Sequence, residues 1–263
     1  MAEEPRSRGE MPFLEHLEEL RWRIIWSLLA ILVGCVVGFF IVDKLDVVGV
    51  LKRPVAPFLA LSNSRLVFTN PTEPILLTFK LAFVVGLLLA FPVIAWQLWA
   101  FLSPALFERE RRLVLPVAVA AVLLFVCGVV LAYVWVLPLA LKVLFGFQSE
   151  SLAPLITAGE YFGFATMVVF AFGAIFELPL VLLLLVYLRI LSAETLSRHR
   201  RIAIVANAIV SAFLTPADVV SMILMMIPVQ VFYELSIVFA RVLERRRSRE
   251  KAAAEGAAAA GRT

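Results

Sequence analysis

The sequence predicts an all-α integral membrane protein with six transmembrane helices and both termini on the cytoplasmic side. Hydrophobic residues make up 62% of the 263-residue chain and charged residues only 17%, whereas soluble domains are about half apolar and a quarter charged. The charges lie mostly between long apolar runs. A run of about 20 apolar residues crosses the hydrocarbon core as a helix, because a helix satisfies its own backbone hydrogen bonds.

The first predicted element is an interfacial helix that continues into the first span. Residues 1–12 are polar, and we expect them to be disordered. Apolar residues then recur at helical spacing from Phe13 to Ile24, and residues 24–42 form an uncharged apolar run. This run is too long for the apolar region of a signal peptide and lacks a clear cleavage site, so we expect it to remain as span 1.

Two charged clusters flank apolar runs and have the character of a surface site. One cluster is His16–Arg23 (HLEELRWR), and the other is Phe107–Arg112 (FERERR). We interpret the two clusters as one site that the apolar runs hold in place. Two interpretations of Glu19 stay open: an i,i+4 pair with Arg23, worth about 0.3–0.5 kcal/mol, or a role in binding.

A long loop and two further spans follow the first span. Residues 43–75 contain several prolines and charges and predict a loop. Span 2 is predicted at residues 75–100, where two tryptophans mark one interface. Span 3 is predicted at residues 113–137, and Pro138 and Lys142 close it.

The fourth predicted span, residues 161–188, contains a glutamate close to a proline. Glu177 lies 12 residues before Arg189, which places it about 18 Å from the inner interface. A carboxylate at this depth is unfavourable unless it is neutral or faces water. Pro179 should bend the helix, so we expect a hydrated pocket here. The alternative is a neutral Glu177 that bonds backbone carbonyls freed by the proline.

The last two predicted spans, residues 202–214 and 219–240, have unusually short uncharged runs. The runs end before Thr215 and before Glu234, so they are about 20 Å and 22 Å long at 1.5 Å per residue. Runs shorter than a hydrocarbon core of about 30 Å thin the bilayer or admit water. The alternative is that span 6 simply continues to Ala240 while Glu234 reaches the interface. We expect residues 244–263 to form a disordered cytoplasmic tail.

The orientation follows from the basic residues. The N-terminus, the loops at 101–112 and 189–201 and the C-terminal tail hold 18 of the 24 lysines and arginines, and the positive-inside rule places these segments in the cytoplasm. Because the basic residues flank spans, the net charge of +4 does not indicate a nucleic-acid partner.

Enzymatic chemistry is poorly supported by the sequence. The two histidines, His16 and His199, lie in predicted cytoplasmic flanks. We find no metal-binding spacing within a span, no nucleophile motif, and no Walker or dinucleotide motif. Cys35 and Cys127 lie in apolar runs and do not suggest a disulfide framework. We therefore expect no catalytic residues, no cofactor and no metal.

Five short motifs recur together in one known family. They are HLEELR (16–21), SPALFERERRLVLP (103–116), FELP (176–179), LTPAD (214–218) and IPVQVFYEL (227–235). With these motifs the sequence resembles the TatC family, the signal-peptide receptor of the twin-arginine protein translocase. The resemblance covers residues 13–243, and it implies one six-helix membrane domain with a glove-like concave arrangement.

The resemblance implies a function in protein export. TatC proteins bind signal peptides with two consecutive arginines together with TatB, and then recruit TatA, so that folded precursors cross the membrane using the proton-motive force. It implies a receptor in the cytoplasmic (inner) membrane, surrounded by lipid and present in several copies per complex, without enzymatic activity.

The resemblance also implies a signal-peptide site. Glu19 and Glu110 match the family's glutamates that contact the arginine pair. Arg21, Phe101 and Pro104 match neighbours that shape this site. An arginine pair offers ten N–H donors and two permanent charges, and carboxylates accept them bidentately, which lysine cannot reproduce.

Further positions match an intramembrane pocket and a docking surface. Glu177, beside Pro179, matches the family's glutamate that faces the concave pocket. The positions where TatB and TatA dock in the family match Thr215, Pro216 and Asp218. In the first outer loop, Pro57, or alternatively Pro54, matches a proline of the family.

The sequence departs from the family pattern at two positions. Residue 217 is alanine where a second proline is common, and Met222 stands where some members have a polar residue implicated in partner contact. The arginines beside Glu110 have two open interpretations, since they either repel unsuitable ligands or only set topology.

Two other functions stay open at this point. One is an ion- or proton-coupled small-molecule transporter that uses Glu177, although the sequence shows no internal repeat of spans and no second buried charge. The other is a purely structural membrane scaffold, which would leave Glu19 and Glu110 without a ligand.

Overall fold

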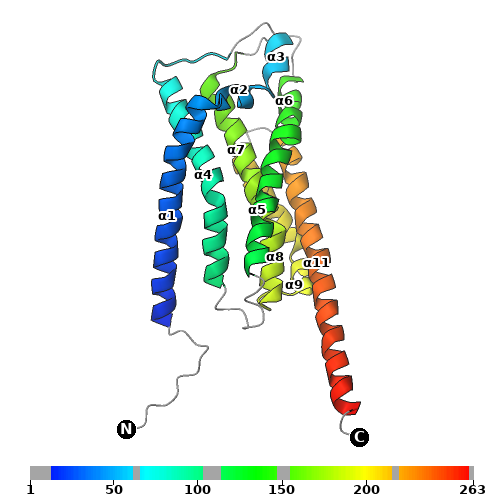
Figure 1. The fold of residues 1–263 in the computed structure, drawn as a ribbon. Coiled ribbons are helices and arrows are strands. Elements are labelled where there is room, and N and C mark those ends of the chain that lie inside the picture. Colours follow the sequence, from blue (N-terminus) through cyan, green and yellow to red (C-terminus); the bar gives the residue numbers. More distant parts are fainter. Residues whose placement is uncertain (1–12, 62–65, 103–113, 147–154, 215–218, 261–263) are drawn as a thin grey trace, which may run out of the picture. The chain divides into compact units, whose positions relative to one another are not determined.

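The computed structural model describes residues 13–61, 66–102, 114–146, 155–214 and 219–260. This part of the chain is helical apart from one isolated parallel β-bridge, Val67 to Thr157, so the prediction of an all-α protein is confirmed. The elements in chain order (Figure 1) are α1 (Phe13–Lys44), α2 (Val47–Lys52), α3 (Ala56–Leu61), α4 (Glu73–Leu102), α5 (Val114–Leu131), η3 (Ala132–Val136), α6 (Leu137–Gly146), α7 (Ala158–Phe176), α8 (Leu178–Tyr187), α9 (Ala193–Arg198), α10 (Arg200–Leu214) and α11 (Val219–Ala260).

Five helical stretches of the described chain are long and apolar enough to cross a membrane. They are Leu17–Lys44, Glu73–Phe101, Leu115–Gly146, Ala158–Tyr187 and Met225–Arg249. These stretches overlap predicted spans 1 to 4 and span 6. Predicted span 5 corresponds to α10, whose 15 residues are about 22 Å long at 1.5 Å per residue. By length alone α10 is therefore too short to cross a full hydrocarbon core.

The chain divides into two compact units. The first contains α1, α2, α4 and the N-terminal parts of α5 and α7. The second contains α3, the rest of α5 and α7, and the elements η3, α6 and α8 to α11. Each unit is described by itself below.

In the first unit, α1 and α4 pack side by side in opposite directions (Figure 1). Small residues make this pairing close: a Cβ atom on Gly34 would collide with the backbone of Gly86, and one on Gly38 would collide with the backbone of Ala82. Membrane helices use such small residues to bring their backbones together, because van der Waals contact drives their association in lipid. The two collisions also define the register, since four residues forward on α1 correspond to four residues back on α4.

At the N-terminal end of α4, its first residue, Glu73, forms hydrogen bonds with two neighbouring segments of this unit. Its Oε2 accepts a hydrogen bond from the Thr69 N–H at 2.9 Å, and its Oε1 accepts one from the Gly159 N–H at 2.7 Å. Nearby, the Ala158 N–H donates to the Val67 carbonyl at 2.7 Å. The start of α7 is thereby held against the segment that leads into α4.

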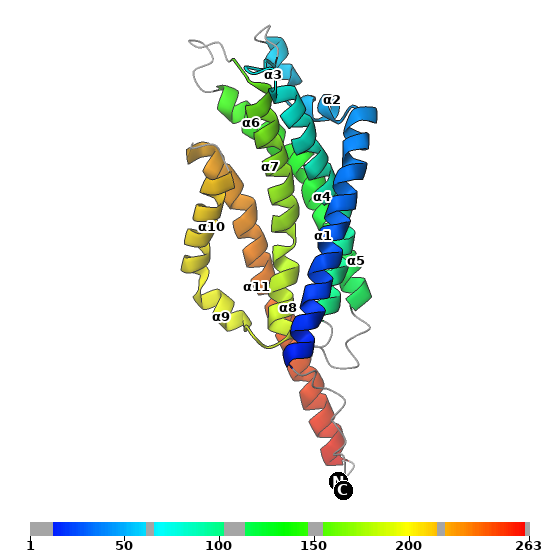
Figure 2. The ribbon, with the colours of Figure 1, turned by 90° about the vertical axis from the view of Figure 1, so that its left-hand side faces the viewer.

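In the second unit, α11 packs against α8, α9 and α10, and Figure 2 shows α10 folding back along α11. A buried apolar cluster that includes Val186, Leu196 and Ile237 joins α8, α9 and α11. Between α10 and α11 the link is polar, because the Asn207 amide donates to the Met226 carbonyl at 2.8 Å. The Ser211 hydroxyl donates in turn to the Asn207 side-chain carbonyl at 3.2 Å.

The fourth predicted span is interrupted at Glu177. α7 ends at Phe176 and α8 begins at Leu178. The Glu177 N–H donates to the carbonyl of Ala174, three residues earlier, at 3.1 Å. Pro179 lies in the first turn of α8, where its missing N–H would have no intrahelical partner. The interruption lies where the sequence predicted a bend.

Span 3 does not end at Pro138, which corrects the sequence prediction. α5 continues through the π-helical turn η3 into α6, which ends at Gly146. The Leu137 N–H donates to the carbonyl of Ala132, five residues earlier. This wider turn lets the helix pass a proline that lacks an N–H donor.

The C-terminal helix also extends further than predicted. We expected span 6 to end at residue 240 and a disordered tail after residue 244, but α11 is helical from Val219 to Ala260. Alanine has the highest intrinsic helix propensity of the amino acids, and the end of this helix is rich in alanine. The sequence-based prediction underestimated this propensity.

Candidate functional site

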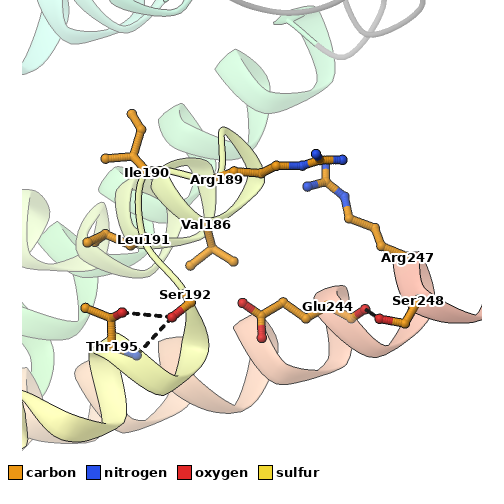
Figure 3. A pocket seen from close by; sticks show the side chains of 9 residues that line it. All are labelled: Val186, Arg189, Ile190, Leu191, Ser192, Thr195, Glu244, Arg247 and Ser248. Atoms are coloured by element: carbon orange, nitrogen blue, oxygen red, sulfur yellow. Dashed lines mark hydrogen bonds between the residues drawn. The ribbon is translucent and has the colours of Figure 1, made fainter. Parts of the chain in front are cut away.

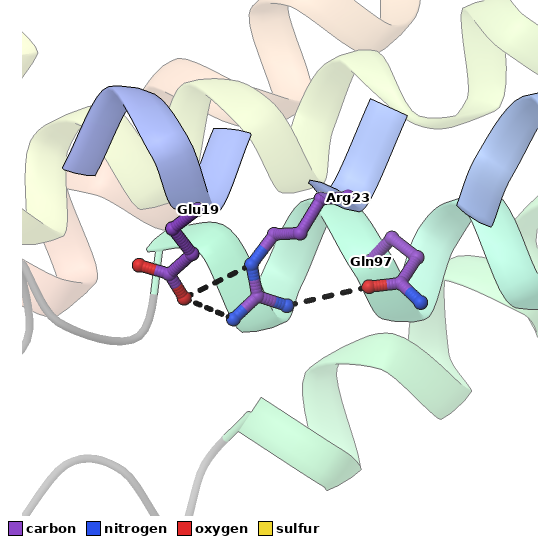
Figure 4. Close-up of polar contacts among 3 residues, drawn as sticks. All are labelled: Glu19, Arg23 and Gln97. Atoms are coloured by element: carbon purple, nitrogen blue, oxygen red, sulfur yellow. Dashed lines mark hydrogen bonds and ion pairs between the residues drawn. The ribbon is translucent and has the colours of Figure 1, made fainter. Parts of the chain in front are cut away.

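The first charged cluster lies on α1, where Glu19 and Arg23 form an ion pair (Figure 4). The Arg23 Nε donates to Glu19 Oε1 at 3.1 Å, and Arg23 Nη2 donates to the same oxygen. The third nitrogen, Nη1, donates to the Gln97 side-chain carbonyl on α4 at 3.4 Å. Both charged side chains are 22% exposed. Arg23 therefore links a partly buried carboxylate of α1 to α4.

The register of the α1–α4 pair places Glu19 at the end of α4. Arg23 faces Gln97, just as Gly34 faces Gly86, so Glu19, four residues before Arg23, is level with Phe101. Phe101 is half-buried in the last turn of α4, which ends at Leu102. Two of the predicted site residues, Glu19 and Phe101, are thus at the same end of one helix pair.

The remaining members of the predicted site are less completely described. Arg21 is exposed on α1. Glu110 and Pro104 lie outside the described residues, in the segment that begins directly after α4. The structure therefore describes the side chains of three of the five predicted residues and the point from which the other two depart.

Glu177 lies half-buried at the interruption between α7 and α8. Its side chain does not cap α8, and its buried Oε1 has no hydrogen-bond partner among the described residues. Directly before it, Phe176 packs edge-on against Phe232 of α11 with ring centroids 4.4 Å apart. A buried carboxyl oxygen without a partner among the described residues is available to form a hydrogen bond with water or a ligand.

The predicted docking residues are placed as follows. Pro57 is exposed on α3, and Met222 is half-buried near the start of α11. Thr215, Pro216 and Asp218 lie outside the described residues. No metal-binding group of three or more histidine, cysteine, aspartate or glutamate side chains occurs in the described part of the chain.

Sequence reasoning missed three polar contacts between distant segments, one of which belongs to the candidate site. The bond from Arg23 to Gln97 spans 74 positions in sequence, and the Glu73 contacts span up to 86 positions. Glu234, for which the sequence predicted no partner, pairs with Arg200 at 2.9 Å. Each partner is far away in the chain, so neither periodicity nor spacing could have indicated these pairs.

Comparison with known proteins identifies the family. The family model described as Sec-independent protein translocase protein (TatC) matches residues 15–228. The chain belongs to the TatC family. The TatC protein of Carboxydothermus hydrogenoformans is 37% identical over 235 residues, which are 89% of this chain and 94% of that protein. The TatC protein of Aquifex aeolicus is 36% identical over 239 residues, which are 90% and 98% of the two chains.

A solved TatC structure has the same fold. A crystal structure of the twin-arginine translocase receptor TatC in DDM superposes with a TM-score of 0.79 at 36% identity, covering 86% of this chain and 99% of the crystallised one. The resemblance drawn from the five motifs is therefore confirmed. TatC proteins belong to a membrane protein translocase, so this chain is an integral membrane protein of a transport family rather than of a catalytic one.

Proposed function

We propose that this chain is the signal-peptide receptor of a twin-arginine translocase, and that it binds the arginine pair of folded precursor proteins through Glu19 and Glu110. One observation carries the proposal. Glu19 already holds a guanidinium group, that of Arg23, at the end of α1 that is level with the end of α4. The segment with Glu110 begins at that same end of α4.

The chemistry of this carboxylate suits an arginine ligand. A guanidinium group presents several N–H donors in a fixed plane, and two of them bind one carboxylate, whereas an ammonium group acts as a point charge. Arg23 donates two N–H groups to one oxygen of Glu19. With one glutamate for each arginine of the signal peptide, two carboxylates satisfy the pair.

The Arg23 pairing adds a specificity mechanism to the proposal. A signal-peptide arginine displaces Arg23 from Glu19, and Arg23 keeps its bond to Gln97. Glu19 then has one guanidinium partner before and after binding, while Arg23 exchanges its ion pair for the hydrogen bond to the neutral Gln97 amide. A lysine ligand would have to replace a planar two-donor contact with a single point charge, and Arg23 would compete against it more successfully.

We extend the proposal to the architecture and the partners of the family. The chain crosses the cytoplasmic (inner) membrane six times, with α10 as a short crossing and both termini in the cytoplasm, and its helices form a glove-like concave arrangement. Several copies assemble with TatB and TatA, which dock at Thr215, Pro216, Asp218, Met222 and Pro57, for export driven by the proton-motive force. Glu177 and Pro179 face the intramembrane pocket. The similarity to a solved TatC receptor supports this extension.

The alternative of a small-molecule transporter rests on Glu177 alone. Family membership favours the receptor, because the whole matched region belongs to a protein translocase family. Binding experiments separate the two: a receptor binds a peptide with the purified chain alone, and a transporter moves a labelled solute.

The proposal is tested by binding fluorescent signal peptides to the chain in nanodiscs. We expect a peptide with Arg-Arg to bind more tightly than one with Lys-Lys. Glu19→Gln and Glu110→Gln should each weaken Arg-Arg binding about tenfold or more, since a hydrogen bond between charged groups contributes about 1.5–3 kcal/mol.

The matched control is Glu18→Gln, which removes the same charge from the exposed neighbouring position of α1. Equal binding of both peptides, or an equal loss in all three variants, would show that these glutamates do not form the receptor site.

A further inference from the structure

An open cavity with a volume of about 560 Å³ lies in the second unit, where α8 ends (Figure 3). Its wall comes from the end of α8, from the turn into α9 and from α11. Two arginines, Arg189 and Arg247, enter it from opposite sides. The proposed peptide site uses neither residue.

Arg189 has a backbone conformation that arginine rarely adopts. Its φ angle is 59°, in the left-handed region. It occupies the position after the end of α8 where helices commonly place glycine, and the next N–H, that of Ile190, donates back to Leu185 at 3.0 Å. A bulky residue with positive φ at such a position is uncommon. The conformation turns the Arg189 side chain over the cavity (Figure 3).

Arg247 is held in place from α11. Its Nη1 donates to the Tyr187 carbonyl at 2.8 Å, and its guanidinium carbon lies 4.1 Å from the centre of the Tyr187 ring. Figure 3 shows the guanidinium groups of Arg189 and Arg247 pointing toward one another. Both groups stay positively charged at every cellular pH, and like charges that face one cavity repel each other.

Neither Arg189 nor Arg247 forms an ion pair within the described residues. Glu244, the acidic residue of the cavity wall, accepts a hydrogen bond from the Ala193 N–H at 2.9 Å, where it supports the first turn of α9. The cavity therefore presents two positive charges, whereas the hydroxyl groups of Ser192 and Ser248 are bonded to Thr195 and to the Glu244 carbonyl.

We infer that this cavity binds a phosphate group through Arg189 and Arg247. Guanidinium groups bind phosphate oxygens through paired N–H donors, and an anion between the two arginines would relieve their repulsion. The cavity lies directly after Tyr187, the last residue of a candidate membrane span, beside the exposed apolar side chain of Ile190. Basic pockets beside the ends of membrane-spanning helices bind the headgroups of anionic phospholipids. We therefore favour the phosphate of such a lipid, rather than free phosphate, as the ligand.

The test measures ligand binding to the delipidated chain in neutral detergent by native mass spectrometry. The ligands are short-chain phosphatidylglycerol, inorganic phosphate and a diacylglycerol of the same chain length without phosphate. We expect phosphatidylglycerol to bind at least tenfold more weakly to Arg189→Gln and to Arg247→Gln. Arg189→Lys should recover part of the loss, because a lysine keeps the charge.

The matched control is Arg245→Gln, which removes a charge from the same helix outside this cavity. If inorganic phosphate binds, and if its binding falls equally in Arg189→Gln and Arg247→Gln, the phosphate site is supported. Free phosphate from the aqueous phase is then its source. Equal binding of diacylglycerol, or an equal loss in Arg245→Gln, would overturn the inference, because contact with lipid chains or overall charge would then explain the binding. Signal-peptide binding is not involved in any of these measurements.

Discussion

At the scale of single residues, one arginine changes the interpretation of the first charged cluster. The sequence left Glu19 with two roles, a local pair with Arg23 or a binding role. The ion pair is present, but Arg23 also reaches α4 through Gln97. The two roles are compatible under the proposed function, because a ligand guanidinium can take the place of Arg23 while Arg23 keeps its bond to Gln97.

Replacing Arg23 tests this exchange. In Arg23→Gln the carboxylate of Glu19 no longer has an internal competitor, so Arg-Arg and Lys-Lys peptides should both bind about two- to fivefold more tightly, the range expected for a pair worth up to about 1 kcal/mol. Selectivity for Arg-Arg should fall. Fluorescence anisotropy in nanodiscs measures both effects. Arg241→Gln, an exposed cation of α11, controls for net charge, and weaker binding in Arg23→Gln would contradict the exchange.

At the scale of elements, close helix pairing sets the positions of the charged side chains. Glu19 lies level with Phe101 only because α1 and α4 meet at glycines in one register. In the second unit, the polar link from Asn207 to Met226 plays the corresponding part for α10 and α11. Both pairings can be disturbed without touching the proposed binding residues.

Gly34→Ala should destabilise the α1–α4 pair. The added Cβ atom would collide with the Gly86 backbone, which cannot move as a flexible side chain can, so we expect a loss of about 1–3 kcal/mol. Thermal unfolding in detergent measures it. Gly146→Ala is the matched control, because a Cβ atom there meets nothing within 4 Å. Equal melting temperatures for the two variants would contradict the close pairing.

Asn207→Leu should loosen the α10–α11 hairpin. Hydrogen bonds between membrane helices contribute about 0.6 kcal/mol on average and up to about 1.7 kcal/mol, so a loss in this range is expected from thermal unfolding. Ile209→Leu, on the exposed face of α10, is the control. A variant as stable as the parent would show that apolar packing alone holds the hairpin.

At the scale of the whole molecule, the prediction concerns topology. With both termini in the cytoplasm, residue 46, in the turn after α1, faces outward, and residue 197, at the end of α9, faces inward. In a chain whose Cys35 and Cys127 are replaced by alanine, Asp46→Cys should react with a membrane-impermeant maleimide on intact cells. Ser197→Cys should react only after the cells are opened. The reverse pattern would invert the proposed orientation.

Some helical elements of this fold could be predicted from the sequence, and others could not. The long apolar helices were predictable, because hydrophobicity over about 20 residues is a local property, and the interruption at Glu177 followed from the proline two residues later. The path of the helix past Pro138 was not predictable, because a π-helical turn accommodates the missing donor. The helical tail was missed, because residues 244–263 were expected to be disordered and the high helix propensity of alanine was not considered.

The sequence by itself determined the all-helical membrane class and the family, and it proposed Glu19, Glu110 and Glu177 as site residues, since these depend on composition and on short contiguous motifs. Only the tertiary structure decided which distant side chains meet. Arg23 reaches Gln97, Glu73 binds Gly159, and Arg189 converges with Arg247 on one cavity (Figure 3). The physical reason is that helix register and backbone conformation, such as the positive φ of Arg189, are set by packing between segments that are far apart in the chain.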